Sequence, residues 1–351
     1  MVDQEKLKTL LYKVMGDLGG AWSVALVRIG DRLGIYKALK KGGAMTSLDL
    51  AAATGLHERY VREWLAHQAV SGYIAYDPAS RKFSLPEEQA LIFASEDSPA
   101  NMLGGFDGAM AMMQAQEPVE AAFKKGGGVA WGDQSACLFC ATARFFRPGY
   151  LTNLVSEWLP ALDGVVDKLQ RGAKVADIGC GHGVSTVTMA KAFPRSRFVG
   201  YDFHPDSIKQ AKAHAAEHKV TGNINFEVAT AKDFKGTDFD LIGCFDCLHD
   251  MGDPAGAAAH IRRALKPDGT WMIIEPMAAD RLEDNFNPVS RLFYAASTLV
   301  CVPSSLAQEV GAALGAQAGE GKLREVIGKG GFSRIRRAAR SATNMILEAR
   351  P

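Results

Sequence analysis

Two clusters of residues in the second half of the chain have the types and spacing to do chemistry. The first is the run Asp177–Gly183, which reads D-x-G-x-G-x-G and stands between a strand-like apolar segment and a helical one. Glycines at such a turn let the backbone bend sharply and let a ligand reach main-chain atoms that a side chain would cover. Asp202 ends the next predicted strand, where a carboxylate can accept hydrogen bonds from ribose hydroxyls. The run is not the dinucleotide fingerprint G-x-G-x-x-G, because the third glycine position is Val184.

The second cluster is the segment Phe245–Met251, with the sequence FDCLHDM, together with Glu275. The segment follows one predicted strand and Glu275 closes the next, so both belong at the carboxyl ends of strands, where open α/β sheets bind ligands. An imidazole with a pKa near neutral is suited to taking a proton from a hydroxyl group. The second cluster is therefore a candidate acid–base site.

The elements that must position these clusters alternate strictly between strand and helix from Lys174 onward. Such alternation predicts an α/β fold with a doubly wound, mostly parallel sheet and right-handed crossovers. The last two strand-like runs are joined by only a few residues, too few for a crossover helix, and so should pair antiparallel. Seven strands are expected, over residues 174–178, 197–202, 223–228, 239–245, 270–275, 332–338 and 344–349.

The first 96 residues read as helices closed by a short hairpin. A helix is predicted over Ala21–Leu39, a short one over Leu48–Thr54, a third over Leu56–Val70, and strands near 73–76 and 82–85. This order is that of a winged helix-turn-helix. We therefore expect three parts: a winged-helix domain at 1–96, a helical segment at 97–165, and the α/β domain at 166–351.

From residue 174 to 351 the chain resembles the class I S-adenosylmethionine-dependent methyltransferases, on the run Asp177–Gly183 and Asp202, and it is similar to small-molecule O-methyltransferases with an N-terminal winged helix. The resemblance implies S-adenosyl-L-methionine as cofactor and assigns roles by position. The cofactor site would include Asp177, and Gly179, Cys180 and Gly181 would contact the aminopropyl and ribose side of the cofactor. Asp202 would bind the ribose, and Phe203 and the backbone of Ala231 and Lys232 would contact adenine. Phe245 and Asp246 would contact the methionyl part. Many relatives have an acidic residue where this chain has Thr230.

The same resemblance makes His249 the general base, Asp250 its neighbour and Glu275 the carboxylate that orients it. Relatives usually have an aromatic residue after the His-Asp pair, whereas this chain has Met251. The acceptor is expected to be a small, hydrophobic molecule methylated at oxygen, under the 97–165 segment as a roof, and no metal is expected. The resemblance also implies a homodimer formed through the N-terminal domain, and the helix Ala21–Leu39 is the expected contact.

Composition sets the remaining expectations. The chain has 351 residues, of which 47% are hydrophobic and 23% charged, and its net charge is +1. This is ordinary globular composition without the strong field that draws proteins to nucleic acid or anionic membranes. No signal peptide is apparent, so a cytoplasmic protein with six reduced cysteines is expected.

Two other functions remain open. A ligand-sensing regulator would use the winged helix on DNA, but Arg59 and Arg62 in its second helix are accompanied by Glu58 and Glu63. A methyltransferase acting on protein or nucleic acid is disfavoured by the balanced charge and by the apolar helical segment.

Several other residues could belong to a functional site, but each also has a purely structural explanation. Cys137-x-x-Cys140 and Cys244-x-x-Cys247 look like zinc half-sites, but the distance between the pairs in the sequence does not match known zinc modules. Methionines in the helical segment are either helical core or an adaptable clamp on a flat acceptor. Polar residues before the last hairpin could orient an acceptor. The residues concerned are Met102, Met110, Met112 and Met113, and then Ser297, Thr298, Cys301 to Pro303, and Gln308.

Overall fold

The computed structural model describes all residues from 1 to 351 and contains two compact units. The first unit comprises residues 1–111 and 144–148, and the second comprises 112–143 and 149–351. Helix α8 (Ala136–Gly149) contributes to both units, since its residues Arg144–Pro148 belong to the first. The segment 97–165, expected as one helical part, is thus divided between the two units.

The first unit contains the winged helix predicted from the sequence. Its elements are α1 (Gln4–Arg32), α2 (Ile35–Gly42), α3 (Ser47–Thr54), α4 (Glu58–Val70), β1 (Ala75–Asp77), β2 (Lys82–Ser84), α5 (Glu87–Phe93) and most of α6 (Leu103–Gln114). Thr46 and Asp49 cap α3 reciprocally, and Gly55 ends that helix with a left-handed φ of 68°. The buried residues Leu50, Leu65 and Trp64 form the centre of this unit.

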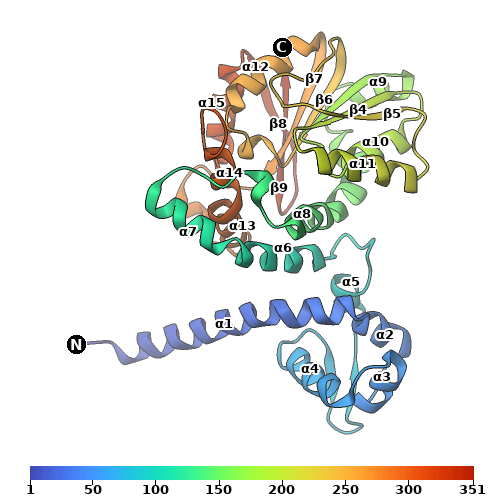
Figure 1. Ribbon diagram of the computed structural model, residues 1–351, viewed down its shortest axis with the longest axis vertical. Coiled ribbons are helices and arrows are strands. Elements are labelled where there is room, and N and C mark those ends of the chain that lie inside the picture. The colour runs from blue at the N-terminus through green and yellow to red at the C-terminus, as the bar shows by residue number, and fades with distance from the viewer. The chain divides into compact units, whose positions relative to one another are not determined.

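The predicted helix Ala21–Leu39 is wrong. The chain instead forms α1, which begins much earlier at Gln4, and the separate helix α2. Gly34 has a φ of 69° between them, a conformation that ends one helix and starts another in a new direction. Figure 1 shows α1 as one long helix whose N-terminal half extends away from α2, α3 and α4. Residues 1–16 are all exposed.

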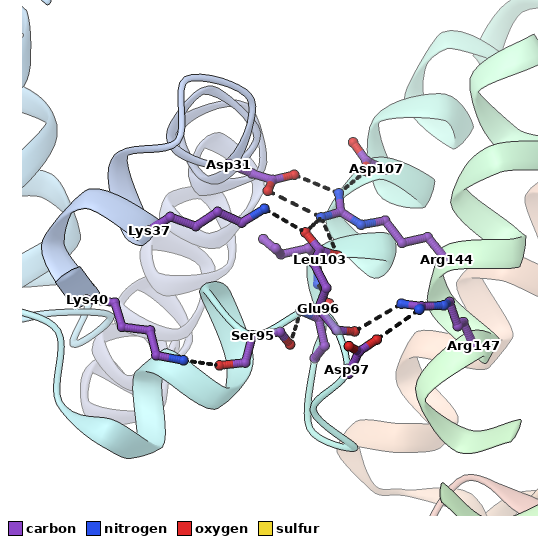
Figure 2. Close-up of polar contacts among 11 residues, drawn as sticks. Asp31, Lys37, Lys40, Ser95, Glu96, Asp97, Leu103, Asp107, Arg144 and Arg147 are labelled. Carbon is purple, nitrogen blue, oxygen red and sulfur yellow. Dashed lines mark hydrogen bonds and ion pairs between the residues drawn. The ribbon is translucent and has the colours of Figure 1, made fainter. Parts of the chain in front are cut away.

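Charged side chains meet inside the first unit around Arg144. Its guanidinium donates to Asp31 at 2.6 Å, to Asp107 at 3.0 Å and to Glu96 at 3.0 Å (Figure 2). Although partial burial opposes the effect, these carboxylates raise the pKa of Arg144 above its usual range. Arg147, one helical turn later, pairs with Asp97 at 2.8 Å. This Arg144 network connects α1, α6, α8 and the segment after α5.

The second unit is built on the predicted seven-stranded sheet. Its strand order is β5-β4-β3-β6-β7-β9-β8, and all neighbours are parallel except the β7–β9 and β8–β9 pairs. The strands are β3 (Lys174–Ile178), β4 (Arg197–Asp202), β5 (Ile224–Val228), β6 (Phe239–Phe245), β7 (Leu265–Pro276), β8 (Arg334–Arg340) and β9 (Asn344–Arg350). The doubly wound sheet and its antiparallel final hairpin are confirmed.

Helices cover both faces of this sheet. The crossover helices α10 (Val184–Ala192), α11 (Pro205–Glu217) and α12 (Pro254–Ala264) contact the sheet, as does α9 (Val165–Arg171). The other helices of this unit are α7 (Gln116–Lys125), α13 (Pro288–Ala296), α14 (Val302–Leu306) and α15 (Gly319–Lys329). In Figure 1, α10 and α11 lie beside β4 and β5, and α12 packs against α15. Every residue of β6 is buried, as expected for a central strand.

Two stretches of wider, π-helical turn interrupt the helical segments of this unit. They are η2 (Tyr150–Trp158), which continues α8, and η5 (Ser297–Cys301), which joins α13 to α14. π-turns of this kind occur often at functional sites, since the extra residue in the turn changes which side chains face inward.

Two helical stretches are long and apolar enough to cross a membrane, α1 near the N-terminus and Pro288–Leu306. Length and composition alone are weak evidence for a span, because buried helices of soluble proteins and signal sequences meet the same criteria.

Candidate active site

The glycine-rich loop after β3 has the backbone that the sequence requires. Gly179, Gly181 and Gly183 have φ angles of 72°, 51° and 74°, in the left-handed region that side chains disfavour. A Cβ on Gly179 would stand 2.8 Å from Cys247 Sγ, and one on Gly183 would stand 2.7 Å from the Phe226 ring. Gly179 and Gly183 are thus closely packed against the protein and leave no room for a side chain.

Asp202, at the end of β4, is tied to this loop. Its Oδ2 accepts from the Gly181 amide at 2.9 Å, and its Oδ1 accepts from the His204 amide at 2.9 Å. Burial raises the pKa of Asp202, although the two amide hydrogen bonds oppose the shift. Each carboxylate oxygen retains a further lone pair, so Asp202 can still accept hydrogen bonds from a diol.

Asp177 lies beneath the loop rather than on it. It is fully buried, and its Oδ2 accepts from the hydroxyls of Ser185 and Thr186, both at 2.6 Å. Burial raises the pKa of Asp177 to about 6. Because both hydroxyls belong to the first turn of α10, Asp177 fixes the loop to the start of that helix. The sequence placed this residue with the cofactor contacts, whereas its own hydrogen bonds support the loop.

The residues expected to contact adenine follow the neighbouring strands β4 and β5. The Phe203 side chain follows β4 and is 46% exposed, an apolar surface left open next to Asp202. Ala231 is half-buried and Lys232 is exposed. The Lys232 ammonium pairs with Glu309 at 3.0 Å and with Asp253 at 3.2 Å, so only its backbone remains for a ligand.

Asp246, after β6, is held by two residues that the sequence analysis did not single out. Tyr150, the first residue of η2, donates its hydroxyl to Asp246 Oδ2 at 3.0 Å, and Asn344 Nδ2 donates to Oδ1 at 2.6 Å. Burial and the nearby Glu275 charge raise the pKa of Asp246 to about 8. Phe245 is buried and packs edge-to-face on the Tyr150 ring at 5.7 Å between centroids. The raised pKa means that the Asp246 carboxyl group holds a proton at neutral pH.

His249 and Glu275 form the pair that their positions predict. His249 Nδ1 donates to Glu275 Oε2 at 2.5 Å, and the other oxygen of Glu275 accepts from the Leu248 amide at 3.0 Å. Both side chains are buried. Nε2 of His249 lies 3.3 Å from Asp250 Oδ1. Burial alone would lower the pKa of His249, but the charges of Glu275 and Asp250 raise it well above the usual range.

Hydrogen bonds from α14 and from the residues just after it hold the loop that carries His249. The Gln308 amide donates to the Asp250 carbonyl at 2.8 Å and accepts from the Gly252 amide at 3.0 Å, and Ser305 donates to the Met251 carbonyl at 2.8 Å. Gln308 was a candidate for orienting an acceptor, but its side chain is used on the protein backbone.

The other residues that the sequence suggested as weak candidates do not gather at one site. Ser297 accepts from the Ala316 amide and Thr298 donates to the Tyr294 carbonyl, so both are engaged internally. The methionines of the helical segment are half-buried or exposed, and none belongs to a core: Met102, Met110, Met112 and Met113. Neither cysteine pair joins a group of metal-ligating side chains, and the group that does form contains Cys301.

The basic residues of the winged helix are neutralised by their own helix. Arg59 pairs with Glu63 at 2.5 Å and Arg62 pairs with Glu58 at 2.7 Å. Helices that read DNA normally present an uncompensated basic edge, which α4 lacks.

Comparison with known proteins identifies both parts of the chain. Residues 169–326 match the family described as Methyltransferase domain, and residues 21–94 match the family described as Rv2258c-like winged HTH domain. Over 133 residues the chain is 33% identical to the ubiquinone biosynthesis O-methyltransferase of Actinobacillus pleuropneumoniae serotype 7 (strain AP76), covering 35% of this chain and 53% of that protein. The chain thus spans about half the length of the curated relatives it matches.

Solved structures share the fold along nearly the whole chain. The mitomycin 7-O-methyltransferase MmcR has a TM-score of 0.73 at 20% identity, covering 99% of this chain and 100% of that one. Human N-acetylserotonin methyltransferase in complex with SAM has a TM-score of 0.72 at 18% identity, covering 97% of both chains. Identities this low establish the common fold alone. The chain therefore joins an N-terminal winged helix-turn-helix domain to a methyltransferase domain, and it shares the overall fold of these two methyltransferase structures.

Proposed function

We propose that the protein transfers a methyl group from S-adenosyl-L-methionine to a small, hydrophobic acceptor, at an oxygen atom. The observation that carries this function is the buried His249–Glu275 pair at the carboxyl ends of β6 and β7. Strand β6 pairs with β3, whose glycine loop is held by Asp202, and β7 pairs with β6 on its other side. A base and a nucleoside-binding loop at one edge of a doubly wound sheet suit group transfer from a nucleoside cofactor.

The residues around the loop fit such a cofactor. The open backbone at Gly181, where a Cβ would meet nothing within 4 Å, leaves room for a ligand above the loop. Asp202 would accept from the ribose hydroxyls, and the exposed Phe203 ring would pack against adenine. Asp246, Phe245 and the buried Cys180 would face the methionyl part. When bound, S-adenosylmethionine supplies a sulfonium methyl group that is already activated for transfer.

The remaining work of the protein is alignment and proton removal. His249 would take the acceptor's proton at Nε2, since Glu275 holds the ring through Nδ1. Because the neighbouring carboxylates raise the pKa of His249, the ring must first lose its Nε2 proton, and transfer should therefore increase as the pH rises. Aligning reactants contributes roughly 7–11 kcal/mol to lowering a barrier, and a positioned base adds about 10²–10⁴-fold in rate. Asp250, on the same side as Nε2, would stabilise the imidazolium that forms.

Replacing the base tests this function directly. We expect His249→Ala to lower single-turnover methyl transfer by about 10²–10⁴-fold and to leave cofactor affinity nearly unchanged, because the ribose and adenine contacts lie elsewhere. Glu275→Gln should cost less, since it disturbs the orientation of the ring and keeps the base. The assay is methyl transfer to a library of phenols and hydroxylated aromatics, beside calorimetric cofactor titration. Near-normal transfer by His249→Ala would show that the histidine is structural.

We further infer that the protein acts in the cytoplasm as a homodimer and does not bind specific DNA. The exposed apolar side chains of α1 support the dimer, and the ion pairs within α4 argue against a DNA-reading helix. Gel-shift assays on genomic fragments should detect only weak, salt-sensitive binding without sequence preference. A specific, salt-tolerant shift would instead favour a ligand-sensing regulator.

A further inference from the structure

The free side of the catalytic histidine faces two other side chains that can bind metal ions. His249 Nε2, Asp250 Oδ1 and Cys301 Sγ all lie within 4.8 Å of one another, and the nitrogen and oxygen are 3.3 Å apart. We propose that these three side chains form a site for a divalent transition-metal ion of the zinc type, and that the bound ion inhibits methyl transfer by occupying the base. The inhibitory part rests on the proposed function, in which Nε2 takes the acceptor's proton.

The donor atoms select the class of ion. One imidazole nitrogen, one thiolate sulfur and one carboxylate oxygen are the ligands that zinc takes in proteins, and three protein ligands leave a fourth position open. Magnesium and calcium prefer oxygen ligands alone, so a site with nitrogen and sulfur discriminates against them.

The separations are close to those of a tetrahedral centre. Bonds of about 2.0–2.3 Å place neighbouring donor atoms roughly 3.3–3.8 Å apart. The His249–Asp250 distance already has this value, and the longest separation in the group needs to shorten by about 1 Å. The movement brings together side chains that already interact, since Asp250 Oδ1 lies beside His249 Nε2 and the Asp250 carboxyl group interacts with the Cys301 thiol.

Access and orientation also suit an ion. The Asp250 side chain is 23% exposed, whereas that of His249 is 4% exposed, so an ion would enter from the side of Asp250. Glu275 accepts from Nδ1 at 2.5 Å and thereby directs Nε2 toward the cluster. A carboxylate on the far nitrogen is the usual second partner of a metal-binding histidine, since it fixes the tautomer and strengthens the ligand. Cys301 reaches the cluster from the end of the π-helical turn η5.

Cobalt(II) is the probe that tests the site, because a cysteine thiolate bound to it gives a ligand-to-metal absorption band in the near ultraviolet. The titration uses the full chain without cofactor or acceptor. We expect the band in the wild type, its loss in Cys301→Ser, and its persistence in the control Cys140→Ser, which removes an exposed thiol of the C-x-x-C pair in α8. Zinc should displace the cobalt. Glu275→Gln should weaken cobalt binding about 10–100-fold.

Three results would overturn the site: no band in the wild type at millimolar cobalt, a band that survives in Cys301→Ser, or a band that disappears in Cys140→Ser. Circular dichroism of Cys301→Ser checks that the variant is folded, and His249→Ala provides a second variant that must also lose binding.

The inhibitory role is tested separately. Zinc at concentrations that saturate the site should abolish methyl transfer by the wild type and leave the residual transfer of Cys301→Ser much less affected. Binding without any methyl transfer would refute the proposed function and keep the metal site. Methyl transfer that is insensitive to zinc, in a protein that binds cobalt, would refute inhibition.

Discussion

At the scale of single residues, the candidate site depends on carboxylates whose surroundings differ although their chemistry is the same. Asp177 is fully buried under the loop, Asp202 is held by two amides, and Asp246 is held by a phenol and an amide side chain. Their positions at strand ends bring these carboxylates to one edge of the sheet. Their hydrogen-bond partners then determine which of them supports the backbone and which can bind a ligand. Of the three, Asp202 is the carboxylate that we propose to bind the ribose.

Removing the Asp202 carboxylate should weaken cofactor binding. Asp202→Ala is expected to lose about 1.5–3 kcal/mol of binding free energy, the usual contribution of hydrogen bonds to a charged group. Calorimetric titration with S-adenosylmethionine measures the loss, and Asp206→Ala, an exposed aspartate in the first turn of α11, is the matched control. Equal affinity in wild type and Asp202→Ala would contradict the ribose contact.

Asp246 should make the protein less stable as pH rises. Its folded-state pKa of about 8 lies above the unfolded value near 4, so between these values the folded state keeps a proton that the unfolded state has lost. The free energy of unfolding therefore falls with rising pH across that window. Asp246→Asn lacks this proton, and its stability relative to the wild type should increase from pH 5 to pH 8, by at most about 1.4 kcal/mol per pH unit.

Denaturant unfolding of both proteins at pH 5, 6, 7 and 8 measures this difference, with Asp206→Asn as control. A difference that does not change with pH would mean that Asp246 titrates normally and is ionised in the folded protein.

At the scale of elements, two π-helical turns determine which side chains face the candidate site, and one network of ion pairs fixes the position of a helix. Tyr150 begins η2 and Cys301 ends η5, and each contacts the candidate site or its proposed metal cluster. One additional residue in a π-turn rotates the side chains that follow it by about 100° relative to a regular helix. The Arg144 network gives α8 a fixed position within the first unit.

Breaking this network should destabilise the first unit. Arg144→Ala leaves Asp31, Glu96 and Asp107 without their common partner, and we expect a loss of about 1.5–3 kcal/mol in unfolding free energy. Arg147→Ala is the control three residues away in the same helix, and it should cost about 0–1 kcal/mol, because the Asp97 side chain is 81% exposed. Thermal and denaturant unfolding compare the two variants. Equal losses would show that the network contributes no more than a surface ion pair.

At the scale of the whole molecule, α1 presents apolar side chains that nothing in a single chain covers. Leu7, Leu11, Val14, Leu18 and Trp22 are all exposed and follow a spacing of three and four residues, so they form one stripe. This stripe lies mostly before the Ala21–Leu39 segment that the sequence analysis selected as the dimer contact. A second copy of the same helix would cover the stripe symmetrically.

Charges placed in the stripe should therefore dissociate the homodimer that we propose. We expect the wild type to be a dimer by light scattering and the double variant Leu11→Glu and Leu18→Glu to be a folded monomer. Lys8→Glu changes the charge of the same helix at an exposed polar position and should remain a dimer. A dimer in the double variant would move the contact to another surface.

The sequence by itself determined the parts of this protein that local patterns control. Alternating apolar segments predicted the seven strands and the winged helix, the spacing of glycines marked the loop after β3, and strand ends located Asp202, His249 and Glu275. These features depend on backbone conformation and on a period of two or 3.6 residues, both of which are written in neighbouring residues.

Only the tertiary structure decided which distant side chains complete the site. Tyr150 and Asn344 reach Asp246 from parts of the chain about a hundred residues away on either side. Cys301 was selected from the sequence as a possible acceptor contact, but only the structure places it beside His249. The break of the first helix at Gly34 and the two π-helical turns likewise escape periodicity, because one glycine or one extra residue changes the direction of every side chain that follows. Contacts of this kind are set by the packing of whole elements, and packing is not encoded in any short stretch of sequence.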